Sequence, residues 1–147
     1  MGRGKCRFIT ILALLAWMGI ILFLSSRTSL PTDAPAIGWL GQYQDEVGHF
    51  GEYAVLGILT FVVLRPRLSG RRAFLYSLAF CVAFSLVDET FQGFVPNRTR
   101  EVKDLVLDAL GAVTAITATS LVRPWLRRYF SNGDALTMKG KSRTSEG

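Results

Sequence analysis

The 147-residue chain contains little cysteine, histidine or charge. Its two cysteines, Cys6 and Cys81, lie at the edge of one apolar run and in the middle of another, so they are too far apart in depth to form a disulfide. The single histidine, His49, has no HExxH, paired-histidine or CxxC pattern around it, so the sequence assigns neither a metal nor a cofactor. An oxygen-rich metal site of His49 and carboxylates stays open as an alternative. The chain also lacks a phosphate-binding glycine loop and a nucleophile elbow, which argues against the common nucleotide-dependent and serine-hydrolase classes.

What the chain has instead is long uncharged segments. Half of its residues are apolar, only 19% are charged, and the mean hydropathy is +0.31, which together favour a membrane protein. Four segments approach the ~20 residues that cross ~30 Å of hydrocarbon, and they span residues 8–24, 47–64, 74–95 and 105–122. The first is longer than a typical signal-peptide core of ~7–15 residues and no clean cleavage site follows it, so we expect it to be retained.

These segments predict an all-α fold, an integral membrane antiparallel bundle of four transmembrane helices. We expect one domain over residues 1–130 and a polar, disordered cytoplasmic tail over residues 131–147. Of the 17 basic residues, 13 precede the first segment, join the second to the third, or follow the fourth. The positive-inside rule therefore places both termini in the cytoplasm. The basic excess indicates topology and contact with anionic lipid in the bilayer, and it gives no reason to expect a nucleic-acid partner.

Acidic residues gather at the opposite ends of the segments. Nine of the 11 acids lie in the predicted outer half or its loops. Charged groups at this depth usually face a protein interior or a water-filled cavity, so their clustering predicts one shared polar cavity. The polar residues of that end are His49, Glu52, Tyr53, Asp88, Glu89, Gln92, Arg98, Asp104 and Asp108.

Helical spacing places several of these residues on common faces. His49, Glu52 and Tyr53 stand at i, i+3 and i+4 of one helix. Asp88 and Glu89 are neighbours and diverge by about 100° around theirs, so we expect one to face the bundle and the other to reach toward water.

Small residues predict close contacts between the helices. Gly48, Gly51 and Gly57 lie in the second segment and let a neighbouring backbone approach. Gly111 follows Asp104 and Asp108 on the same helix face and opens a run of small residues, so tight packing is expected there as well.

At these residues the chain resembles the VanZ-like family of small bacterial membrane proteins, named for a teicoplanin-resistance protein. The resemblance covers about residues 8–122. The residues that carry it are Asp45, His49, Phe50, Tyr53, Asp88, Glu89, Gln92, Pro96, Arg98, Asp104, Asp108 and Gly111. Two positions depart from the family pattern, because Glu46 stands where the family often has Lys and Asp108 where it often has Asn. The resemblance implies a multi-pass protein of the bacterial cytoplasmic (inner) membrane, similar to proteins that are linked to the cell envelope and to glycopeptide resistance.

Three kinds of function fit this sequence, and whether any reaction is catalysed stays open. The first is an extracytoplasmic-facing site that binds or modifies an envelope component, such as a lipid-linked envelope precursor or a glycopeptide. Its candidate catalytic residues are His49, Glu52, Asp88, Glu89 and Asp104, and its candidate substrate-binding residues are Tyr53, Gln92, Arg98 and Asp108. The second is a proton-coupled transport accessory, which the uncharged inner halves and the lack of an inverted repeat disfavour. The third is a structural or regulatory protein whose polar cluster locks the bundle. The sequence does not fix the substrate or the oligomeric state.

Overall fold

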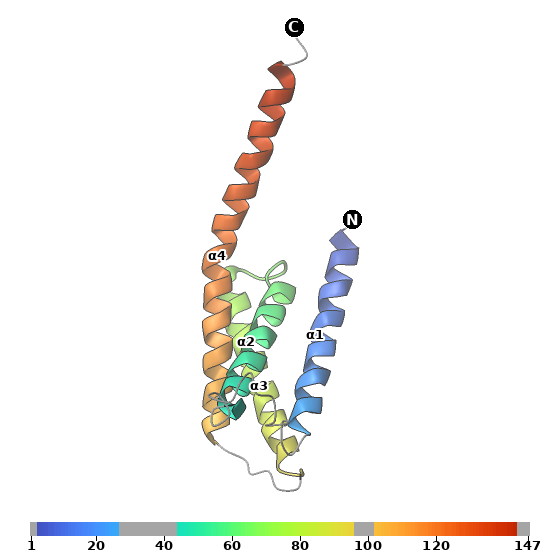
Figure 1. The fold of residues 1–147 in the computed structure, drawn as a ribbon, viewed down its shortest axis with the longest axis vertical. Coiled ribbons are helices and arrows are strands. Elements are labelled where there is room, and N and C mark those ends of the chain that lie inside the picture. The colour runs from blue at the N-terminus through green and yellow to red at the C-terminus, as the bar shows by residue number, and fades with distance from the viewer. Residues whose placement is uncertain (1–2, 27–43, 96–101, 144–147) are drawn as a thin grey trace, which may run out of the picture. The chain divides into compact units, whose positions relative to one another are not determined.

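The computed structural model describes residues 3–26, 44–95 and 102–143, with side chains described except at positions 3, 4, 6, 44, 45 and 125–143. Within these ranges the chain forms four helices and no strand (Figure 1). They are α1 (Arg3–Ser25), α2 (Gln44–Leu64), α3 (Gly70–Gln92) and α4 (Val102–Arg143). All four are long and apolar enough to cross a membrane, which confirms the predicted all-helical membrane fold.

The chain divides into two compact units, Met1–Ile116 and Thr117–Gly147. The first unit contains α1, α2, α3 and the beginning of α4. In the second unit α4 continues past Pro124 to Arg143. The domain boundary at residue 130 and the disordered tail over residues 131–147 stay predictions.

Consecutive helices of the first unit run in opposite directions (Figure 1). A short turn joins α2 to α3, held by hydrogen bonds from the backbone N–H groups of Arg67 and Leu68 to the carbonyl of Leu64, at 3.0 and 3.2 Å. A turn this short makes α2 and α3 antiparallel neighbours. The end of α1, the start of α2, the end of α3 and the start of α4 therefore lie at one end of the bundle, which we call the polar end (Figure 1).

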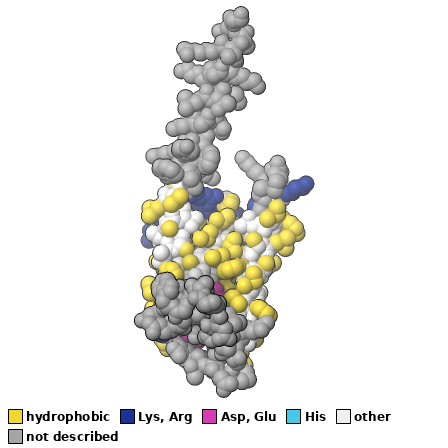
Figure 2. All heavy atoms as spheres, in the orientation of Figure 1, with side chains coloured by type: hydrophobic (Ala, Val, Ile, Leu, Met, Phe, Trp, Pro, Cys, Tyr) yellow, Lys and Arg dark blue, Asp and Glu magenta, His cyan; other side chains and the backbone are white. Residues whose placement is uncertain are grey.

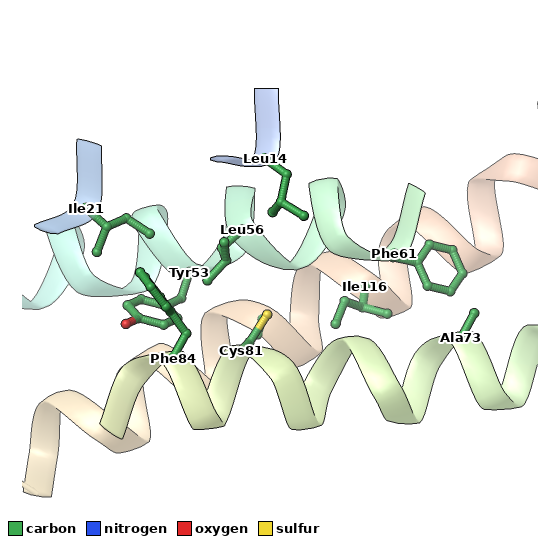
Figure 3. Packing of buried hydrophobic residues seen from close by; sticks show 10 residues of the cluster. Leu14, Ile21, Tyr53, Leu56, Phe61, Ala73, Cys81, Phe84 and Ile116 are labelled. Carbon is green, nitrogen blue, oxygen red and sulfur yellow. The ribbon is translucent and has the colours of Figure 1, made fainter. Parts of the chain in front are cut away.

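Apolar side chains fill the centre of this unit and also cover its outside. The buried cluster takes residues from all four helices (Figure 3). Its members are Leu14, Ile21, Tyr53, Leu56, Phe61, Ala73, Cys81, Phe84, Ala112 and Ile116. Large apolar residues such as Phe8, Leu15 and Leu75 point outward, and Figure 2 shows apolar side chains across the middle of the visible face. A surface this apolar suits contact with lipid.

Two glycines let α2 and α4 touch along their backbones. A Cβ on Gly57 would lie 3.2 Å from the Cα and carbonyl oxygen of Ala112, and one on Gly111 would lie 2.2 Å from the carbonyl oxygen of Phe50. Close approach is thus confirmed at Gly57 and Gly111. Phe50 and Gly57 are seven residues apart, so they share one face of α2.

The expected close approach at the other two glycines of α2 is wrong. A Cβ on Gly48 or Gly51 would meet nothing within 4 Å in the described part of the chain. Gly48 precedes Gly57 by nine residues and Gly51 precedes it by six, which turns both away from the face that meets α4.

Candidate functional site

A buried hydrogen-bonded chain joins three helices at the polar end. The Nδ1 atom of His49 on α2 lies 3.1 Å from Oδ1 of Asp108 on α4, and the Ser85 hydroxyl on α3 donates to Oδ2 of Asp108 at 2.5 Å. All three side chains are buried. The Nδ1–H tautomer of His49 donates this hydrogen bond to Asp108. The other ring nitrogen, Nε2, then faces away from Asp108.

Asp104 lies on that other side of the imidazole, and Glu89 lies near both residues. Oδ2 of Asp104 is 3.8 Å from Nε2 of His49, so the ring sits between two carboxylates that are one helical turn apart on α4. One carboxylate oxygen of Glu89, on α3, also lies within 4.8 Å of His49 and Asp104 ligand atoms. The i, i+4 spacing of Asp104 and Asp108 therefore brackets a single histidine.

A second polar group links α1 to α3. The side-chain amide of Gln92 donates to Oδ2 of Asp88 at 3.1 Å and to the hydroxyl of Ser25 at 3.3 Å. Asp88 is fully buried, Gln92 is 1% exposed and Ser25 is 3% exposed. Among the described residues no hydrogen-bond donor reaches Oδ1 of Asp88, and no partner reaches the hydroxyl of Tyr53. Buried polar atoms nearly always have a partner, so these two atoms are positions where water or a ligand group can bind.

The expectation that either Asp88 or Glu89 reaches water is wrong, because both are buried, with exposures of 0% and 8%. The two residues do diverge around α3, but other helices cover both directions. The end of α1 covers Asp88 through the contacts of Ser25 and Gln92, while His49 lies on the side of Glu89.

The remaining predicted residues are placed as follows. Tyr53 is fully buried and its ring packs against Phe84, with ring centroids 6.4 Å apart (Figure 3). Glu52 is half-buried on α2, and its backbone carbonyl accepts a 2.9 Å hydrogen bond from the indole N–H of Trp17 on α1. Arg98 lies outside the described residues. Catalytic and substrate-binding roles for all nine residues stay predictions.

Sequence reasoning missed two members of the site, Ser85 and Ser25. Ser85 had a detectable signal, because it lies three residues before Asp88 and four before Glu89 and so shares the acidic face of α3. Ser25 had none, since a serine at the end of an apolar helix is ordinary. Its role depends on how α1 packs against α3.

Outside this buried group, a salt bridge joins the first turns of α2 and α4. Lys103 pairs with Glu46, and the side chains are 57% and 26% exposed. Glu46 is one of the two positions that depart from the VanZ-like pattern. Its pairing with Lys103 shows that an acid here has a partner on α4.

The arrangement favours ligands that offer hydrogen-bond donors or positive charge. Carboxylates only accept hydrogen bonds, whereas hydroxyl, amide and amine groups donate them. The imidazole of His49 lies between its two flanking carboxylates, and its ring nitrogens can donate or accept a hydrogen bond according to the tautomer. Large apolar side chains on the same helices face outward, so a ligand with a lipid portion meets a compatible surface.

Comparison with known proteins identifies a family. A family model described as VanZ/LLP1 matches residues 10–123, which is most of the chain and includes every described residue of the polar site. Neither the curated proteins nor the solved structures give a match.

Proposed function

Because the chain belongs to the VanZ/LLP1 family, we propose that it binds or modifies a component of the bacterial cell envelope at its polar end. The protein lies in the cytoplasmic membrane with this end on the extracytoplasmic side. The component is a lipid-linked envelope precursor or a glycopeptide, and both carry many hydroxyl and amide donors. Teicoplanin, to which the protein that gives the VanZ-like family its name confers resistance, is a glycopeptide of this kind.

The observation that best supports this proposal is the separation of acidic and basic residues between the two ends of the bundle. The buried carboxylates lie at the polar end, and basic residues gather at the other end, where Figure 2 shows dark-blue side chains. The described basic residues there are Lys5, Arg7, Arg65, Arg67, Arg71 and Arg72. Basic residues stay on the cytoplasmic side of bacterial membranes, which supports an outward-facing carboxylate site.

The chemistry of the polar end supports binding. Oδ1 of Asp88 and the hydroxyl of Tyr53 have no partner among the described residues, so each can bond to a ligand hydroxyl or amide. His49 lies between Asp104 and Asp108, so the imidazole is placed among the carboxylates that would bond the ligand.

Capture of the envelope component tests this proposal. The full chain is purified from bacterial membranes in mild detergent, and co-purifying lipid-linked glycans are quantified by mass spectrometry. Asp88→Asn weakens an acceptor that bonds the ligand, and loss of one charged hydrogen bond, ~1.5–3 kcal/mol, lowers captured ligand by roughly tenfold or more. Glu46→Gln removes an acid at the same end but outside the buried group, so it retains the ligand.

Two results would count against binding. Equal capture by the wild type, Asp88→Asn and an unrelated membrane protein would mean that the lipid is carried over with the detergent. Loss of monodisperse, folded protein in every variant of the buried group, with no ligand in the wild type, would instead favour the structural role.

A further inference from the structure

Three side chains from three helices direct ligand-type atoms to one point at the polar end. His49 on α2, Glu89 on α3 and Asp104 on α4 each offer one such atom, and all three atoms lie within 4.8 Å of one another. Nε2 of His49 and Oδ2 of Asp104 are 3.8 Å apart. His49 and Glu89 are buried, and the side chain of Asp104 is 15% exposed, so the point lies inside the bundle close to its end.

The Nδ1 side of the His49 imidazole, which faces Asp108, shows a second feature of metal sites. Histidines that bind metals almost always donate their other ring N–H to a carboxylate or carbonyl, which fixes the tautomer and the ring orientation. His49 makes this contact through Nδ1 to Asp108 at 3.1 Å, and Ser85 in turn holds Asp108 at 2.5 Å. The lone pair of Nε2 then lies on the side of Asp104, and Glu89 has a carboxylate oxygen within 4.8 Å of both residues' ligand atoms.

We propose that His49, Glu89 and Asp104 bind a divalent metal ion of the zinc type, positioned by Asp108 and Ser85. One imidazole and two carboxylates form the mixed nitrogen and oxygen ligand set that zinc accepts. Ligand atoms of a tetrahedral zinc site lie about 3.4 Å apart. The observed separations therefore need only side-chain adjustments of about 1 Å or a little more.

The sequence leaves a metal site of His49 and carboxylates open but does not show which carboxylates take part, because the ligands are far apart in the chain. Metal motifs such as HExxH place two ligands on one helix. Here each ligand comes from a different helix, and packing of α2 against α3 and α4 brings them together. The inference deepens the proposed function and rests on it, since three protein ligands leave coordination positions for an oxygen of the bound envelope component.

Metal content of the purified protein tests the inference. The full chain carries a peptide tag without histidine, is incubated with Zn²⁺, is desalted, and is analysed by mass spectrometry for zinc per chain. The wild type holds about one zinc, and His49→Ala, Glu89→Gln and Asp104→Asn each lose most of it. Glu46→Gln is the matched control and keeps the wild-type content.

Asp108 provides a test of positioning. Asp108→Ala removes the partner of Nδ1 without touching the metal, and loss of such a partner weakens zinc affinity about 10–100-fold in a chelator competition. Asp108→Asn keeps an acceptor for the Nδ1 proton and restores most of that affinity. Thermal unfolding of each variant, with and without Zn²⁺, separates loss of binding from loss of folding, because only a folded site shows stabilisation by the ion.

The inference is overturned if the wild type retains no zinc, or if the three ligand variants, eluting as folded protein, retain as much as the wild type. Its failure is distinguishable from that of the proposed function. Envelope component captured equally well by metal-free protein overturns the metal site alone. One zinc per chain without any captured component upholds the metal site and counts against the proposed function alone.

Discussion

Replacing Gly111 with alanine is expected to push α2 and α4 apart beside the polar site. The new Cβ would lie 2.2 Å from the carbonyl oxygen of Phe50, 3.0 Å from its carbonyl carbon and 3.2 Å from its Cα. All three are backbone atoms, so no side-chain rotation relieves the clash. The helices must separate by at least about 0.8 Å to bring the first contact to 3.0 Å.

The cost follows from that displacement. Overpacking a tight interior costs typically 1–3 kcal/mol, and a clash between two backbones belongs at the upper end. Alanine regains up to about 1 kcal/mol of helix propensity, which leaves a net loss of about 2 kcal/mol. Because Asp108 precedes Gly111 by one turn and His49 adjoins Phe50, the displacement also lengthens the 3.1 Å contact between His49 and Asp108.

Steric trapping in bilayers measures the free energy of unfolding, which we compare between Gly111→Ala and two control variants. The matched controls are Gly57→Ala, whose Cβ would have contacts of 3.2 Å, and Gly51→Ala, which meets nothing within 4 Å. We expect Gly57→Ala to lose about 1 kcal/mol and Gly51→Ala to gain a few tenths or more. Gly111→Ala as stable as Gly51→Ala would refute the backbone contact between α2 and α4.

Three further substitutions test individual contacts by the same measurement. Ser85→Ala removes the donor to Asp108 and leaves a buried carboxylate short of a partner, so the free energy of unfolding falls by about 1–3 kcal/mol; an unchanged value would mean that this hydrogen bond does not form. Trp17→Phe loses the 2.9 Å hydrogen bond to the carbonyl of Glu52 and costs about 1 kcal/mol; an effect below a few tenths would place α1 elsewhere. Lys103→Gln breaks an exposed salt bridge and changes stability by less than about 1 kcal/mol; a larger loss would show that this pair is buried in the membrane.

The fold follows from the sequence because helix length and hydropathy are local properties. Four apolar segments of the length of a bilayer predict the four helices that the structure contains. Helix-helix contacts are less local, as the glycines of α2 show. Gly48, Gly51 and Gly57 have the same small side chain, and only the crossing point of α4 decides that Gly57 is the one in contact.

The sequence predicts which residues lie at the polar end but not which of them contact one another. Helical periodicity and the position of each residue within its apolar segment place the acids and His49 at one end of the bundle, and the described ones lie there in the structure. No pattern shows that Asp108 pairs with Nδ1 while Asp104 faces Nε2, because this depends on the rotation of α2 relative to α4. Asp88 and Glu89 on α3 are both buried for a similar reason. The end of α1 packs against one side of α3, and the sequence of α3 alone does not predict this contact.

The central claim, that the polar site faces the cell envelope, is tested most directly by thiol labelling in intact cells. In a protein with Cys6 and Cys81 replaced, a single cysteine is placed at Phe94 beyond the end of α3 or at Ser69 before its start, both exposed positions. A membrane-impermeant maleimide should label the cysteine at Phe94, whereas the one at Ser69 should react only after the cells are opened. The reverse pattern would contradict the account and put the carboxylates in contact with the cytoplasm.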